Sequence, residues 1–212
     1  MLFNYFLYAF IALFPLVNPV AMSSAFFNMT KHATDEQRKK LATLVTIYGT
    51  TLLLGTLLVG PYLLSFFGLQ PADIRVAGGL IVFSIAWRML HPPREPEAKQ
   101  KQSNGDDVMH LAFFPLTMPL TAGAGSIAIT IALATQAHKA SNMMDQYIAV
   151  ALAIIAIFIL VFFCYRYAAT IFKVLGKTGS VVVSSMSAFI LLAIGVSVIW
   201  SGIRIFIESM PK

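Results

Sequence analysis

Charged residues are absent from long stretches of this chain, and these stretches predict its helices. Asp, Glu, Lys and Arg are missing from residues 76–87 and from five longer stretches, which are residues 1–30, 41–72, 108–138, 146–165 and 178–203. A bilayer core of about 30 Å takes roughly 20 apolar residues per helix. We therefore predict six membrane spans, at about residues 3–29, 42–66, 72–91, 109–136, 146–168 and 183–207. The prediction of the third span assumes that its flanking charged residues lie at the membrane interface, where long cationic side chains extend toward water.

The composition supports this prediction. Of 212 residues, 58% are hydrophobic and only 11% are charged, whereas a soluble domain carries about 25% charged residues. A free soluble domain, a disordered chain and a disulfide scaffold are therefore excluded. We predict an all-α polytopic membrane protein with one domain, in which residues 1–91 form the first half, 92–108 a linker and 109–212 the second half.

The basic residues predict the orientation of the spans. Eleven of the 15 Lys and Arg residues fall in the first, third and fifth connections between spans. Cytoplasmic loops carry an excess of Lys and Arg. We therefore expect these connections to be cytoplasmic and both termini to lie outside. The net charge of +6 then follows from topology, and we expect no nucleic-acid partner.

The two halves share a motif at an offset of 100 residues. Five positions of the segment IALFPLVNPVA are identical in LAFFPLTMPLT, namely Ala12, Phe14, Pro15, Leu16 and Pro19, which recur as Ala112, Phe114, Pro115, Leu116 and Pro119. With three spans in each half, the second half enters the membrane from the opposite side. The sequence therefore predicts a 3+3 inverted repeat, an architecture common among secondary transporters.

Spans one and four are predicted to be discontinuous. Each contains two prolines four residues apart, and proline both lacks an N–H group and disfavours helical geometry in the residue before it. Backbone groups freed in this way need partners from protein or from water in a cavity. The alternative is a pair of proline-kinked helices whose polar atoms only satisfy each other; kinked spans and re-entrant hairpins both remain open.

The chemistry predicted for these breaks is that of a neutral site. No Asp or Glu lies in the core of a predicted span, since Asp73, Asp145 and Glu208 sit at span ends, whereas cation pumps and proton relays usually place an ionisable residue inside the membrane. Helix N-termini can accept a carboxylate and free carbonyls can accept an ammonium group, so we expect a small neutral amino acid or similar small solute. The residues predicted to bind it are Asn18, Pro19, Ser23, Thr121, Gly123, Gly125 and Ser126.

Other features predict no further chemistry. The four histidines do not have metal-ligand spacing, and no nucleophile–base pair or phosphate loop is visible, so we expect neither a metal, nor a cofactor, nor an enzyme. His91 and His110 lie at cytoplasmic span ends, so coupling of transport to protons remains open. Hydroxyl and carbonyl groups could bind Na⁺, so coupling to Na⁺ remains open as well. A homo-oligomer is also possible. Glycines inside spans, namely Gly49, Gly55, Gly60 and Gly195, are expected to permit close helix contact.

Several motifs together resemble those of the MarC family of bacterial inner-membrane proteins. They are Asn18-Pro19-Val20, residues 75–81 (RVAGGLI), residues 115–128 (PLTMPLTAGAGSIA) and residues 175–179 (LGKTG). Ala21 and Ser24 stand where many members have Gly and Pro, and Ala124 stands where many have Pro. The family is grouped with LysE-type amino-acid exporters, and some members are described as transporters of small neutral amino acids.

The resemblance and the residues together favour a secondary transporter. We expect an exporter or exchanger of small neutral amino acids that works by alternating access of two inverted halves. Two alternatives remain: efflux of uncharged antibiotics or metabolites, and a membrane scaffold that transports nothing.

Overall fold

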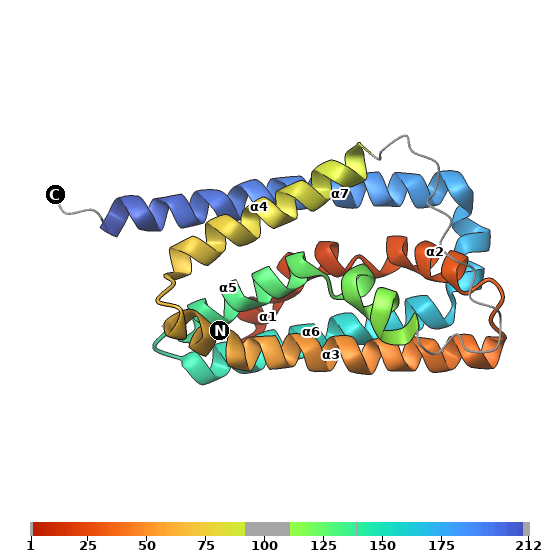
Figure 1. Cartoon of the computed structure of the whole chain (residues 1–212), viewed down its shortest axis with the longest axis horizontal. Coiled ribbons are helices and arrows are strands. Elements are labelled where there is room, and N and C mark those ends of the chain that lie inside the picture. Colours follow the sequence, from red (N-terminus) through yellow and green to blue (C-terminus); the bar gives the residue numbers. More distant parts are fainter. Residues whose placement is uncertain (1, 92–110, 139, 210–212) are drawn as a thin grey trace.

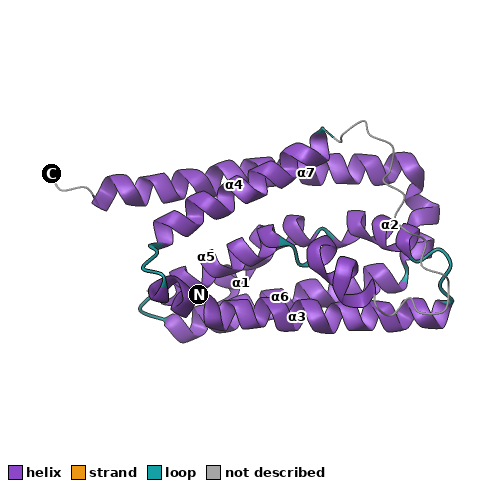
Figure 2. Ribbon diagram, in the orientation of Figure 1, coloured by secondary structure: helices purple, strands orange, loops and turns teal. Residues whose placement is uncertain are grey.

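The chain folds as a bundle of helices (Figure 1). The computed structural model describes residues 2–91, 111–138 and 140–209, and none of these residues forms a strand (Figure 2). In chain order the elements are α1 (Leu2–Val17), α2 (Pro19–Met29), α3 (Asp35–Phe66), α4 (Pro71–Leu90), η2 (Phe113–Thr121), α5 (Ala124–His138), α6 (Met143–Arg166) and α7 (Ala168–Ser209). The all-α prediction is confirmed. The predicted linker at 92–108 and His110 lie outside the described residues, and the division into halves stays a prediction.

Four stretches are long and apolar enough to cross a membrane. They are Leu2–Met29, which comprises α1 and α2, together with Asp35–Phe66, Met143–Arg166 and Val181–Glu208. They correspond to predicted spans one, two, five and six. Helix α4 has 20 residues but carries Asp73, Arg75 and Arg88, and η2 and α5, with 9 and 15 residues, are each shorter than the roughly 20 residues of a span. Six spans therefore stay a prediction.

Two helices extend beyond the spans that the apolar pattern predicted. Helix α3 begins at Asp35 because Thr34 caps it: the Thr34 hydroxyl accepts from the Gln37 N–H at 3.2 Å, and the Gln37 side chain accepts from the Thr34 N–H at 2.9 Å. This reciprocal capping box satisfies two otherwise free N–H groups. Helix α7 begins at Ala168 and bends at Gly176, whose φ of 62° suits a residue without a side chain.

The helix ends collect at two ends of the bundle (Figure 1). The start of α1, the α3–α4 connection and the last turns of α7 lie at one end, here called the terminal end. The α2–α3 connection and the α6–α7 junction lie at the other. We call this the basic end because Lys31, Arg38, Arg166 and Lys173 lie on these segments.

Helices α4 and α7 make the most extensive contact between two helices, and they run side by side along one flank of the bundle (Figure 1). A β carbon placed on Gly79 would lie 2.8 Å from the Gly195 carbonyl oxygen, so the two backbones touch at these glycines. Gly49 and Gly60 likewise face side chains of α6 and α5, whereas nothing lies within 4 Å of a β carbon at Gly55. The expected close helix contact is confirmed at Gly49, Gly60 and Gly195 and is wrong at Gly55, which faces outward.

The remaining helices pack in a regular pattern around the breaks in the chain. Helix α3 packs against α5, α6 and η2, and α1 packs against α6. Helix α2 packs against α6 and α7, while α5 packs against α3 and α4. The buried side chains between them include Leu13, Phe26, Leu53, Phe158 and Tyr165. This packing buries the first interruption and the later part of the second, whereas Phe114 at the start of η2 is 67% exposed.

Candidate functional site

The first break lies at Asn18, between α1 and α2. Asn18 adopts the left-handed conformation, with φ 44° and ψ 58°, which asparagine tolerates better than most residues. The cause is local, because Pro19 disfavours helical geometry in the residue before it. The Asn18 N–H still donates to the Phe14 carbonyl at 2.8 Å, and the Asn18 carbonyl accepts from the Met22 N–H at 2.9 Å. A new helix N-terminus therefore starts at Pro19.

The Asn18 side chain is only half satisfied. It is 4% exposed, and its Oδ1 accepts from the Ser187 hydroxyl of α7 at 3.2 Å. Its Nδ2 group is buried without a hydrogen-bond partner, and so is the Ser24 hydroxyl of α2. A buried polar group without a partner costs about 1–3 kcal/mol. Most native proteins avoid such groups, so these two call for an explanation.

The second break is spread over η2 and the two residues after it. Phe114 and Met118 have extended backbone angles, with φ near −120° and ψ near 124°, and each precedes a proline, as the steric rule requires. The hydroxyls of Thr117 and Thr121 donate to the carbonyls five residues earlier, at 2.6 and 2.7 Å. These side chains thus give the carbonyls of the irregular segment additional hydroxyl donors.

A buried tyrosine joins the two interrupted segments. The Tyr165 hydroxyl of α6 lies 2.7 Å from the Thr121 hydroxyl of η2, and both residues are fully buried. The Tyr165 ring stacks on Phe26 of α2, with ring centres 4.3 Å apart and planes 16° apart. Tyr165 therefore contacts α2 and η2 at once, close to the basic end where α6 terminates.

Helix α5 begins directly after the second break. The Gly123 carbonyl accepts from the Ile127 N–H at 3.1 Å and from the Ser126 hydroxyl at 2.9 Å. A β carbon placed on Gly125 would lie 2.8 Å from Leu16 Cδ2, two residues before the first break. The missing side chain of Gly125 thus lets the start of α5 approach the end of α1.

The structure brings the predicted site residues to two breaks that approach each other at Gly125. Six of them are buried and Gly123 is half-buried, as the residue-by-residue burial shows for Asn18, Pro19, Ser23, Thr121, Gly123, Gly125 and Ser126. Two do less than expected: the Ser23 hydroxyl donates to the Val20 carbonyl of its own helix at 2.6 Å, and Ser126 likewise bonds locally. Within the described ranges, no hydrogen bond joins one break to the other.

Two contributing residues were not predicted from the sequence. Ser187 lies 169 positions from Asn18, and Tyr165 lies 44 positions from Thr121. Each contributes a hydroxyl inside an apolar span, and this is the only feature of the sequence that could have indicated either residue. Such a feature does not predict which group the hydroxyl will bond to.

Charge is absent from the breaks. Arg38 is the only buried charged side chain in the part of the chain that the structure describes, and it lies at the basic end. Its guanidinium donates to the Thr30 and Ala33 carbonyls, each at 3.2 Å, and pairs with Asp35 at 2.8 Å. Among the residues that the structure describes, no cluster of His, Cys, Asp or Glu could bind a metal. The breaks can therefore offer hydrogen bonds and helix dipoles to a ligand, but no ionic partner.

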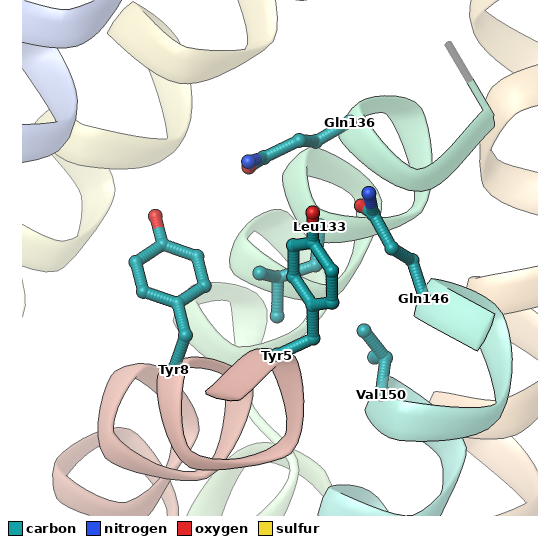
Figure 3. Close-up of a pocket in the computed structure, with 6 residues that line it drawn as sticks. All are labelled: Tyr5, Tyr8, Leu133, Gln136, Gln146 and Val150. Carbon is teal, nitrogen blue, oxygen red and sulfur yellow. The ribbon is translucent and has the colours of Figure 1, made fainter. Parts of the chain in front are cut away.

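Two hollows lie away from the breaks. A recess of about 10 Å³ at the terminal end is lined by Tyr5, Tyr8, Gln136, Gln146 and two aliphatic residues, and the polar tips of these four side chains gather around it (Figure 3). Roughly 10–15 Å³ is what one water molecule needs. The second is an apolar groove of about 360 Å³ on the outer side of α4 and α7. Neither hollow is lined by a residue of the two breaks.

Comparison with known proteins identifies relatives along nearly the whole chain. The sequence profile described as MarC family integral membrane protein matches residues 3–207. The inner membrane proteins MarC of Salmonella paratyphi B and Salmonella typhimurium are each 31% identical over 207 residues, and that of Escherichia coli is 30% identical; each alignment covers 94% of both chains. No solved structure matches the chain.

Proposed function

The chain belongs to the MarC family of integral membrane proteins, and from this premise we propose that it is a secondary transporter that exports or exchanges small neutral amino acids. One observation carries the proposal: two interrupted segments start new helices inside an apolar bundle, at Pro19 and Ala124, with no acidic side chain buried among the described residues. Discontinuous helices of this kind hold substrate in many secondary transporters. The proposal assigns no catalytic step and no metal or cofactor.

We propose further that the two halves form an inverted repeat and work by alternating access. The packing supports this, because exchanging α1 with η2, α2 with α5, α3 with α6 and α4 with α7 reproduces most of the helix contacts; the contacts of α6 with α5 and α7, and of α1 with α7, have no counterpart of similar extent. Both motifs also deviate from helical geometry at matching positions, Asn18 and Met118, each directly before a proline. Rocking of one half against the other would open the buried breaks to each side in turn.

The neutral chemistry of the breaks supports the choice of substrate. A zwitterion can place its carboxylate against N–H groups at a helix N-terminus, and its ammonium group against carbonyls beside the prolines. Neither contact needs a charged side chain, and none is present. The close approach of α5 to α1 at Gly125 favours a small solute. Coupling to H⁺ or Na⁺ is an open part of the proposal: exposed His91 stacks on Trp87 at 4.3 Å between ring centres, away from the breaks.

We also propose that the protein spans a bacterial inner membrane with the basic end in the cytoplasm and both termini in the periplasm. The names of the relatives include the words inner membrane. Lys31, Lys173 and their basic neighbours gather at one end of the bundle, as expected for cytoplasmic connections. Cysteine labelling of exposed Asn4 and Lys40 from each side of the membrane tests this orientation.

Counterflow in liposomes tests the proposed transport. Labelled alanine should accumulate in vesicles loaded with unlabelled alanine, and Asn18→Ala or Gly123→Leu should abolish that accumulation. The matched controls are Asn4→Ala, an exposed asparagine of α1, and Gly55→Leu, where nothing lies within 4 Å. Both controls should retain exchange. Failure to exchange any amino acid would favour a scaffold, and exchange of chloramphenicol-like compounds instead would favour efflux; either result overturns the proposal.

A further inference from the structure

The two atoms of the Asn18 amide are in different states, and this difference has a chemical consequence. The oxygen accepts a hydrogen bond from Ser187 at 3.2 Å, whereas the Nδ2 group is buried without a partner. A primary amide nitrogen offers two donors and no acceptor. The free side of Asn18 can therefore bind only an acceptor, such as a carboxylate or carbonyl oxygen.

We infer that Asn18 Nδ2 is a donor subsite that receives the carboxylate of the substrate, and that Ser187 is the positioning residue that turns the amide this way. This inference rests on the proposed function and adds the orientation of the ligand to it. The Ser187 hydroxyl donates to Oδ1, and while this bond is made the Nδ2 group faces the free side. With Ser187 in place, an ammonium group is excluded from this side of Asn18, because two donors cannot pair.

The backbone around Asn18 has the same polarity. The first N–H bonded within α2 is that of Met22, which donates to Asn18, so the amides of Val20 and Ala21 belong to the free first turn of an 11-residue helix. Such groups and the helix dipole favour a negative charge. Donors of two kinds, the Asn18 amide nitrogen and the free backbone N–H groups, therefore meet at one helix end.

The second break does not repeat this arrangement. Met118 occupies the position equivalent to Asn18, and methionine has no hydrogen-bond donor. The Ser126 hydroxyl near the start of α5 already donates to the Gly123 carbonyl. The site is thus asymmetric, and the carboxylate faces α2 rather than α5. The ammonium group of an amino acid then lies on the side of η2 and α5.

A binding measurement on the full-length protein in detergent tests the subsite separately from transport. Labelled L-alanine is competed by unlabelled L-alanine and by L-alaninol, in which a hydroxymethyl group replaces the carboxylate. L-Alaninol should compete at least tenfold more weakly. Asn18→Asp, which removes the donor, should weaken alanine binding at least tenfold and abolish the preference, while Ser187→Ala should reduce the preference several-fold. The controls Asn4→Asp and Ser197→Ala, at exposed positions, should behave like the unmodified protein.

The outcomes separate the subsite from the transport function. L-Alaninol competing within twofold of alanine, or an unchanged preference in Ser187→Ala, overturns the subsite even if Asn18→Asp fails to fold. Alanine binding with the expected preference but without counterflow keeps the subsite and overturns the proposed transport. Counterflow of alanine without a carboxylate preference does the reverse, and absence of both binding and counterflow overturns both.

Discussion

The hydrogen bond between Tyr165 and Thr121 gives the sharpest test of how the interrupted segments are held. The Thr121 hydroxyl has one proton, and it donates this proton to the Leu116 carbonyl at 2.7 Å. The Tyr165 hydroxyl, 2.7 Å away, must therefore be the donor to Thr121. The two ends of this hydrogen bond are not equivalent, so removing one or the other should have different costs.

Tyr165→Phe removes a single donor and leaves nothing unpaired. Thr121 keeps its bond to Leu116, and the ring still stacks on Phe26, so we expect a loss of about 1 kcal/mol in the free energy of unfolding. Thr121→Val leaves both the Tyr165 hydroxyl and the Leu116 carbonyl buried without this partner. At about 1–3 kcal/mol for the unpaired tyrosine hydroxyl and about 1 kcal/mol for the hydrogen bond lost at the Leu116 carbonyl, we expect a loss of roughly 2–4 kcal/mol.

The double variant completes the cycle. In Tyr165→Phe/Thr121→Val the unpaired tyrosine hydroxyl no longer exists, so the combined cost should fall about 1 kcal/mol or more below the sum of the single costs. Reversible unfolding of the purified protein in mixed micelles measures these differences. Tyr8→Phe, which alters a tyrosine that is 57% exposed, should stay within about 0.5 kcal/mol of the unmodified protein. Equal costs for the two single variants, or strict additivity in the double variant, would refute the assigned direction of the hydrogen bond.

Three further predictions follow from close contacts and from the buried charge. Gly79→Ala should destabilise the protein by about 1–3 kcal/mol through overpacking against α7, whereas Gly55→Ala should stabilise it by up to about 1 kcal/mol. Thermal unfolding compares the two variants, and equal effects would contradict the close contact of α4 with α7 at Gly79. Arg38→Met should cost about 2–3 kcal/mol, because carbonyls lose a charged donor, while Lys40→Met should be near neutral in the same assay. Gly125→Leu should lower alanine counterflow at least tenfold while the protein remains monodisperse, and full activity would show that the close approach to α1 is unimportant.

The two motifs that contain the helix breaks were predictable from the sequence, but the prolines that break the helix were not, since Pro15 lies inside α1. Pro19 and the prolines of the second motif act on the residue directly before them through steric contact and a missing N–H group, so the deviations at Asn18, Phe114 and Met118 follow from neighbours in the chain. The long apolar helices were also predictable, because the spacing of apolar and charged residues along them depends on whether a segment lies in lipid or in water. The start of α3 at Asp35 was not predicted, because the apolar pattern begins only after its charged first turns. A capping box at Thr34 starts the helix there.

The partners of the polar groups were decided by tertiary structure alone. Ser23 and Ser126 have the same hydroxyl chemistry as Ser187, yet they bond to their own helices, whereas Ser187 reaches Asn18 from 169 residues away. Which hydroxyl meets which group depends on how helices cross, and that depends on packing across the whole bundle. Local sequence therefore determined where the chain breaks and that no charge lies there. Only the packed structure decided that one face of Asn18 is occupied and the other is free.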